Sequence, residues 1–289
     1  MNEDYRKVKV ALLSIISNST LIILKIVAGI LSGSVSIISE AIHSSVDLVA
    51  SFVAFISVKA SSKPADDKHP YGHGKIENVS GVIEGALILV ASGMIILESI
   101  KKIFNQQPID NEYLAVGVMF VSGFVNFLVS KKLYKVSKEV DSMALEADAL
   151  HLKTDVYTSL GVGIGILLIK LTGIHILDSV VAILVGCLII KEAIELIRHG
   201  FDDIIDRRLS DEEEDEIKEV IEQHKYQFID FHKLKTRKSG SMKHIDFHIT
   251  LEPDTTVQKA HDIIGYIKKY INEKISNTRV NIHIDPAKK

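Results

Sequence analysis

The chain has 289 residues, of which 47% are hydrophobic, and its formal net charge is −3. So small a charge argues against a nucleic-acid-binding protein, which needs a basic surface, so no nucleic-acid partner is expected. The apolar residues lie mainly before residue 200, whereas the chain from about Ser210 onward is charged and includes the run SDEEEDEIKE. We therefore predict a transmembrane domain over residues 1–208 and a soluble domain over residues 209–289.

Six apolar runs divide the first region, and each is long enough to cross a hydrocarbon core of about 30 Å at about 1.5 Å per residue. They cover approximately residues 8–31, 35–58, 79–103, 113–133, 144–171 and 176–197. Runs of this length and number predict a polytopic membrane protein with six transmembrane helices. The single cysteine, Cys187, excludes a disulfide framework within one chain.

The positive charges of the short loops predict the orientation of the helices. Lysine and arginine gather before the first run and in the second and fourth loops, and the pair Lys101–Lys102 is outweighed by them. Both termini are therefore expected in the cytoplasm of a multi-pass protein, most simply one of the cell (inner) membrane. The charges that decide this are Arg6, Lys7, Lys9, Lys63, Lys68, Lys75, Lys131, Lys132, Lys135 and Lys138.

Two histidine–aspartate pairs interrupt the apolar runs. His43 and Asp47 lie in the second run, and His151 and Asp155 repeat the same spacing in the fifth. Residues four apart share one face of a helix, and counting about 1.5 Å per residue puts both pairs roughly 11 to 18 Å deep. An ionisable residue at that depth needs a partner. The alternative is that the two pairs form unrelated hydrogen bonds. This alternative is less favoured because both pairs lie at the same depth in the membrane.

Two imidazoles and two carboxylates suit a tetrahedral divalent ion, for which zinc is the commonest occupant. Cobalt or cadmium fits the same ligand types. Four other polar residues inside the runs are expected to line a cavity or to form interhelical hydrogen bonds rather than to bind metal. They are Lys25, Glu40, Glu84 and Asn126.

A second candidate metal site lies in the loop DDKHPYGHGK between the second and third runs. Asp66, His69 and His73 stand close together where Pro70 and glycines bend the backbone, and three such ligands can hold zinc with a water or another group in the fourth place. The alternative is a polar turn with incidental histidines.

The region after residue 209 reads as helix, strand, strand, helix, strand. Ser210 and Glu213 form a capping-box pattern that opens a helix over about 211–225, and KSGS joins two alternating strands as a hairpin. This order predicts a small α+β domain with helices on a three-stranded sheet.

Histidines are dense in this domain. Alternation places His283 and Asp285 on one face of the last strand, and His244, Asp246 and His248 on one face of the hairpin. His232 and His261 are expected near the same surface. A single surface histidine carries no function, but together these residues predict a cytoplasmic metal-binding surface.

These stretches together resemble the cation diffusion facilitator family, the proton-coupled zinc exporters, over nearly the whole chain. The residues that carry the resemblance are HSSVD at 43–47, PADDKHPYGHGK at 64–75, ADALHLKTD at 147–155, TRKSG at 236–240, DFHI at 246–249 and HIDP at 283–286. The resemblance implies a six-helix transport domain, a metallochaperone-like αββαβ cytoplasmic domain, and a homodimer.

The resemblance also assigns residues to sites. It implies a transport site of His43, Asp47, His151 and Asp155, a loop site of Asp66, His69 and His73, and cytoplasmic sites of His232, His248, His261, His283 and Asp285. Part of the family has aspartate in place of His43, so the imidazole favours zinc over iron or manganese.

The expected function is export of zinc from the cytoplasm in exchange for protons by alternating access. Metal and protons compete for the same imidazoles and carboxylates, so binding of one displaces the other. Zinc is then the substrate and a regulatory or structural ion of the cytoplasmic domain. The alternatives are cobalt, cadmium or iron as main substrate, or a membrane metal sensor that transports nothing. An intramembrane zinc hydrolase is disfavoured because no His-Glu-x-x-His pattern is present, so the chain is expected not to be an enzyme.

Overall fold

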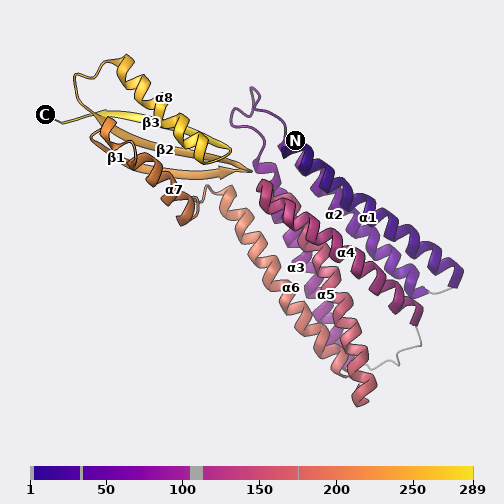
Figure 1. The fold of residues 1–289 in the computed structure, drawn as a ribbon. Coiled ribbons are helices and arrows are strands. Elements are labelled where there is room, and N and C mark those ends of the chain that lie inside the picture. The colour runs from indigo at the N-terminus through magenta and orange to yellow at the C-terminus, as the bar shows by residue number, and fades with distance from the viewer. Residues whose placement is uncertain (1–2, 33–34, 105–112, 175, 289) are drawn as a thin grey trace. The chain divides into compact units, whose positions relative to one another are not determined.

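The structure is a computed structural model that describes residues 3–32, 35–104, 113–174 and 176–288. It divides into two compact units, Met1–Phe201 and Asp202–Lys289. Figure 1 shows that the first is helical and that the second is built on a sheet. The predicted domain boundary after Arg208 stays a prediction.

Six long helices make up the first unit, which confirms the helical membrane domain predicted from the apolar runs. Each helix is longer than its run, because polar residues continue the helix beyond the apolar centre. The helices are α1 (Glu3–Ser32), α2 (Val35–Ser61), α3 (Lys75–Phe104), α4 (Tyr113–Val140), α5 (Met143–Thr172) and α6 (Ile176–Ile204).

The outer surface of these helices is apolar, as a hydrocarbon environment requires. Large apolar side chains such as Ile23, Val90 and Phe124 are exposed, which would be a liability in water. By length and composition alone, three stretches among the described residues qualify as membrane spans: Glu3–Leu31, Lys75–Phe104 and Met143–Ile169.

Helices α1, α2, α4 and α5 share one core. Its buried residues come from all four helices, for example Ala11 of α1, Val58 of α2, Leu133 of α4 and Leu152 of α5. Figure 1 shows α1 and α2 running side by side. This packing holds the predicted ligand helices α2 and α5 against each other.

Helices α3 and α6 approach each other through glycines. A Cβ atom at Gly85 would lie 2.7 Å from Ile197 Cγ1, and one at Gly186 would lie 2.7 Å from Ile96 Cγ1. Small residues allow such close backbone contact between membrane helices. Gly85 and Gly186 therefore set the separation of this helix pair.

A buried ion pair ties four helices together at one end of the unit. Lys7 Nζ on α1 donates to Glu77 Oε1 on α3 at 3.0 Å, and Ser61 at the end of α2 donates to the same oxygen at 2.7 Å. Ser142, which caps the N-terminus of α5, donates to the other oxygen of Glu77. The carboxylate is therefore fully engaged, as a buried charge must be.

The second unit has the predicted αββαβ order. It contains α7 (Asp211–Glu222), a 3₁₀ turn (Lys225–Gln227), β1 (Asp230–Ser239), β2 (Met242–Leu251), α8 (Val257–Lys274) and β3 (Thr278–Pro286). The sheet order is β1-β2-β3, with β1 antiparallel and β3 parallel to β2. The predicted α+β domain is confirmed.

One face of the sheet packs against α7 and α8. Ile245, Phe247 and Ile249 alternate along β2 and are fully buried with Ile217 of α7 and Ile267 of α8. The residues between them on β2 must then point to the opposite face. The histidines are thus brought to the face that lacks these helices.

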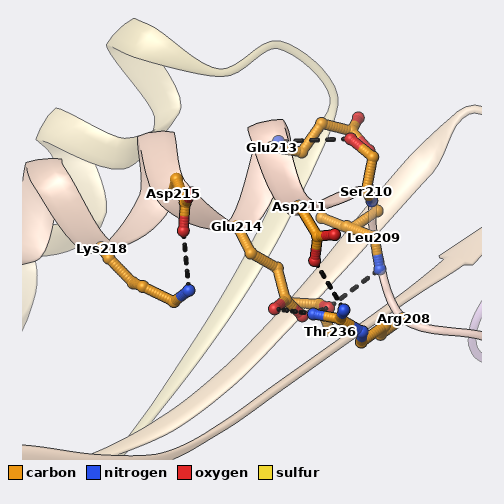
Figure 2. A network of polar contacts seen from close by, with 9 residues as sticks. All are labelled: Arg208, Leu209, Ser210, Asp211, Glu213, Glu214, Asp215, Lys218 and Thr236. Atoms are coloured by element: carbon orange, nitrogen blue, oxygen red, sulfur yellow. Dashed lines mark hydrogen bonds and ion pairs between the residues drawn. The ribbon is translucent and has the colours of Figure 1, made fainter.

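The start of α7 carries the predicted capping box (Figure 2). Glu213 N donates to Ser210 Oγ, while Ser210 N donates to Glu213 Oε2 at 3.1 Å. Beside it, Thr236 Oγ1 on β1 donates to Glu214 at 2.7 Å, and Arg208 pairs with the same carboxylate at 2.7 Å. These contacts join the start of α7 to the sheet.

Replacing Ser210 with alanine is expected to lower the local stability of α7 by about 1 kcal/mol, because the amide of Glu213 loses its acceptor. Native-state hydrogen exchange on the full chain should then show α7 amides exchanging roughly fivefold faster. Ser210→Asp, which keeps a capping oxygen, should exchange like the parent. Equal exchange in the alanine variant would show that the cap contributes nothing.

Candidate metal centres

The first candidate centre lies between α2 and α5. His151 Nε2 and Asp47 Oδ1 are 3.1 Å apart, and only 16% and 8% of their side chains are exposed. The two residues are separated by about a hundred positions in sequence, so only helix packing brings them together. An imidazole and a carboxylate at this distance can both reach one ion once the proton between them is removed.

Asp155 lies one helical turn beyond His151 on α5. Its Oδ2 accepts a hydrogen bond from Asn126 Nδ2 on α4 at 3.0 Å, which agrees with the hydrogen-bonding role expected of Asn126. His43 lies on α2 one turn from Asp47, but its side chain falls outside the described residues. The structure thus joins Asp47 to His151, and the four-ligand transport site remains a prediction.

Sequence reasoning overlooked the polar residues that adjoin this pair. Ser51 Oγ on α2 donates to Asp148 Oδ1 on α5 at 3.0 Å, and it accepts a hydrogen bond from Asn18 Nδ2 on α1 at 2.8 Å. Asp148 is completely buried. Asp148 could have been singled out from the sequence, because it is an acidic residue inside an apolar run, one turn before His151, and such a residue needs a partner.

The loop candidate is assembled as the spacing predicted. Asp66 Oδ1 lies 3.2 Å from His69 Nδ1, Asp66 Oδ2 lies 3.4 Å from His73 Nε2, and the three ligand atoms are within 4.8 Å of one another. Gly72 has φ of 88°, a left-handed conformation that a side chain would oppose. This turn brings His73 back toward Asp66.

The Asp66 carboxylate is prepared to act as a ligand. The backbone N–H of His69 donates to it at 2.6 Å and is the main reason that the pKa of Asp66 lies below its usual value, while burial acts in the opposite sense. The N–H of Lys68 adds a second bond. Asp66 therefore stays ionised into mildly acid conditions.

The third candidate centre spans all three strands of the sheet. Asp285 Oδ2 on β3 accepts hydrogen bonds from His232 Nε2 on β1 at 3.1 Å and from His248 Nδ1 on β2 at 2.9 Å. His283 Nε2 lies 3.4 Å from the other oxygen. The register explains this, because His248 pairs with His232 on one side and with His283 on the other.

Asp285 is held in its ionised form, which can bind a cation. The hydrogen bond from His248 is the main cause that holds the pKa of Asp285 below its usual range, with burial opposing it and His232 adding to it. Ligand atoms of His232, His248 and Asp285 lie within 4.8 Å of one another. A divalent ion could replace the imidazole protons that now bridge these atoms.

Two histidines of this domain lie apart from the cluster. His261 is exposed on α8 and is outside the group of three converging ligands found among the described residues. His244 shares the strand face of His248 by alternation, but it is buried and is paired in register with Arg237 and Arg279. Burial, followed by repulsion from these arginines, lowers the pKa of His244, so this imidazole is kept neutral.

Replacing Asp285 with asparagine is expected to weaken zinc binding to the His232–His248–Asp285 cluster by roughly tenfold or more, because even the loss of a supporting hydrogen-bond partner costs that much at metal sites. Titration calorimetry of the purified full chain measures this. Asp246→Asn, on the same strand face as His248, is the matched control. Equal zinc binding by Asp285→Asn and the control would remove Asp285 from the ligands.

Family comparisons agree with this organisation. A family model described as "Cation efflux transmembrane domain" matches residues 11–205, and one described as "Cation efflux protein, cytoplasmic domain" matches residues 209–287. The first match covers most of the helical unit, and the second covers the sheet with α7 and α8.

Similar proteins match over nearly their full lengths. An uncharacterized transporter of Synechocystis, sll1263, is 34% identical over 263 residues, which are 91% of this chain and 85% of that protein. The manganese efflux system protein MneP of Bacillus subtilis is 31% identical, with 96% of this chain and 95% of MneP covered.

The cation-efflux pump FieF of Shewanella oneidensis is 28% identical over 95% of this chain and 92% of that protein. A solved structure of CzrB covers 28% of this chain and 99% of its own, with 25% identity and a TM-score of 0.27. From the two family matches and the similarity to MneP and FieF, the chain belongs to the cation diffusion facilitator family of membrane cation efflux transporters.

Proposed function

We propose that this transporter exports zinc from the cytoplasm in exchange for protons, and that it works as a homodimer. The observation that carries the proposal is the 3.1 Å contact between His151 and Asp47 across α2 and α5. With Asp155 one turn further on α5 and His43 one turn from Asp47 on α2, two nitrogen and two oxygen ligands are available for one ion.

Proton exchange follows from the chemistry of these ligands. A metal binds the neutral imidazole and the ionised carboxylate, and a proton on either group displaces it. When the site faces the cytoplasm, zinc displaces protons. When the site faces outward, protons entering down their gradient displace zinc. Rigid movements of helix groups around a central site provide such alternation in other transporters.

Zinc is favoured over other metals by the imidazole ligands, since nitrogen donors suit zinc better than manganese or magnesium. Manganese is the second candidate, because the chain is 31% identical to the manganese efflux system protein MneP over 95% of that protein. Cobalt, cadmium and iron remain further alternatives. A metal panel in proteoliposomes under an imposed pH gradient separates these substrates.

The loop and tail clusters are proposed as additional zinc sites. His232, His248 and Asp285, with His283 beside them, lie on the sheet face away from α7 and α8, where a second copy of the chain can reach them. Zinc bound there would stabilise the dimer only if zinc binds more tightly to the dimer than to the separate chains.

Replacing Asp47 or Asp155 with asparagine is expected to abolish zinc flux, because the amide keeps the shape but removes the charge that zinc needs. Proteoliposomes with an inward proton gradient measure zinc and proton movement together. Glu98→Gln, at an exposed position of α3, is the control.

Normal coupled flux in either aspartate variant would refute the assigned transport site. An unaltered chain that binds zinc but moves neither zinc nor protons would instead favour a metal sensor. Flux and zinc binding of the unaltered chain therefore distinguish the two functions.

Replacing His43 with aspartate is expected to widen selectivity toward cadmium, because an oxygen donor alters both ligand type and charge. The zinc-to-cadmium rate ratio should fall by roughly tenfold, about 1.4 kcal/mol of discrimination. Measuring the ratio in the same proteoliposomes cancels differences in the amount of active protein. An unchanged ratio would contradict the role of His43.

A further inference from the structure

Two buried carboxylates in the membrane unit have no part in the proposed transport site. Glu84 on α3 is 1% exposed, and Asp148 on α5 is completely buried. Each comes from a different helix, and each lies inside a stretch that qualifies as a membrane span. Carboxylates in such a place are costly unless something neutralises them.

Serine hydroxyls surround these carboxylates, and Ser14 on α1 also interacts with Asp148. Ser80 Oγ donates to Glu84 Oε1 at 3.2 Å, and Ser51 Oγ donates to Asp148 Oδ1 at 3.0 Å. Within the part of the chain that the structure describes, Glu84 Oε2 and Asp148 Oδ2 are buried and receive no hydrogen bond. Buried polar atoms without a partner are rare and call for a ligand.

The two carboxylates lie on neighbouring, packed helices. A Cβ atom at Gly81, one turn before Glu84, would lie 2.7 Å from Met143 Cγ, so α3 and α5 approach closely at this level. Glu84 and Asp148 are near enough to repel each other electrostatically, and His151 attracts both. A bound cation would turn that repulsion into attraction to a shared ion.

This pair adjoins the proposed transport site. Asp148 precedes His151 by three residues on α5, and its partner Ser51 follows Asp47 by four residues on α2, so both stand about one turn away on the same side. That side leads to the beginning of α5 and the end of α2, where Ser142 and Ser61 bind Glu77. The C-terminal domain is cytoplasmic by its family match, and α6 enters it, so this is the cytoplasmic side.

We propose that Glu84 and Asp148 form a second cation site, which holds a divalent metal on the cytoplasmic side of the transport site. Its donors are oxygens: the two carboxylates, with the hydroxyls of Ser51 and Ser80 beside them. Oxygen-only sets suit hard ions such as Mn²⁺ and Mg²⁺ better than zinc. The site therefore differs in chemistry from the histidine-containing one, and it gives Glu84 a role as a ligand that its sequence position did not predict.

The site would hold a cation one turn short of the transport ligands. Asp47 is the next carboxylate that an ion leaving Asp148 would meet, because Ser51, which binds Asp148, lies one turn from Asp47 on α2.

Mn²⁺ binding to the full chain tests the proposal, with free Mn²⁺ counted by electron paramagnetic resonance. The background variant carries Asp47→Asn, Asp66→Asn and Asp285→Asn, which disable the three other candidate centres. We expect it to keep one Mn²⁺ per chain and to lose it when Glu84→Gln is added. Glu98→Gln, on the same helix but exposed, should leave that ion bound.

A second measurement does not depend on the folding of the multiple variant. Glu84→Gln alone, in the otherwise unchanged chain, should lower the Mn²⁺ count by one. Two results would overturn the site. In one, the background variant binds no Mn²⁺ and Glu84→Gln alone leaves the Mn²⁺ count unchanged. In the other, the background variant keeps its Mn²⁺ after Glu84→Gln is added. Binding is measured without transport, so either result leaves the proposed zinc–proton exchange to its own test.

Discussion

The contact between Asp47 and His151 is the interaction on which the proposed transport site depends. A carboxylate inside an apolar helix is tolerated only when a partner or an ion compensates its charge, and here the partner comes from another helix. Packing of α2 against α5 is therefore a condition both for compensating this buried charge and for assembling the proposed transport site. The shared core of α1, α2, α4 and α5 provides that packing with small residues such as Ala11 and Ala144.

Polar groups continue from this contact toward the cytoplasmic end in successive layers. Ser51 and Asp148 form the next layer, Ser80 and Glu84 lie on the neighbouring helix, and Lys7 and Glu77 close the end with a buried ion pair. Among the described residues of these layers, only those of the last one include an opposite charge within hydrogen-bonding distance. The Lys7–Glu77 ion pair is neutral overall and has a structural role, whereas the carboxylates of Glu84 and Asp148 can still bind a cation.

The tail illustrates which site residues can be predicted from sequence. Alternation along β2 and β3, a local property of each strand, predicted that His248 lies on one face of its strand and His283 with Asp285 on one face of theirs. The register of the two strands then brought them together. His244 obeys the same alternation but is buried, between strands that pair it with Arg237 and Arg279. His261 belongs to a helix whose position relative to the histidine face no local pattern specifies. The loop ligands Asp66, His69 and His73 are close in sequence, so spacing was sufficient there.

Sequence alone determined the elements and the side chains that share each of them, since helix length, the four-residue spacing of His151 and Asp155, and strand alternation all follow from backbone periodicity. It also identified the family, because motifs in both domains occur in one order. Tertiary structure alone decided which helices meet: that Asp47 reaches His151, that Ser51 reaches Asp148, and that Lys7 reaches Glu77. Such contacts join residues far apart in the chain, and they depend on the packing of whole helices, to which no local sequence pattern is sensitive.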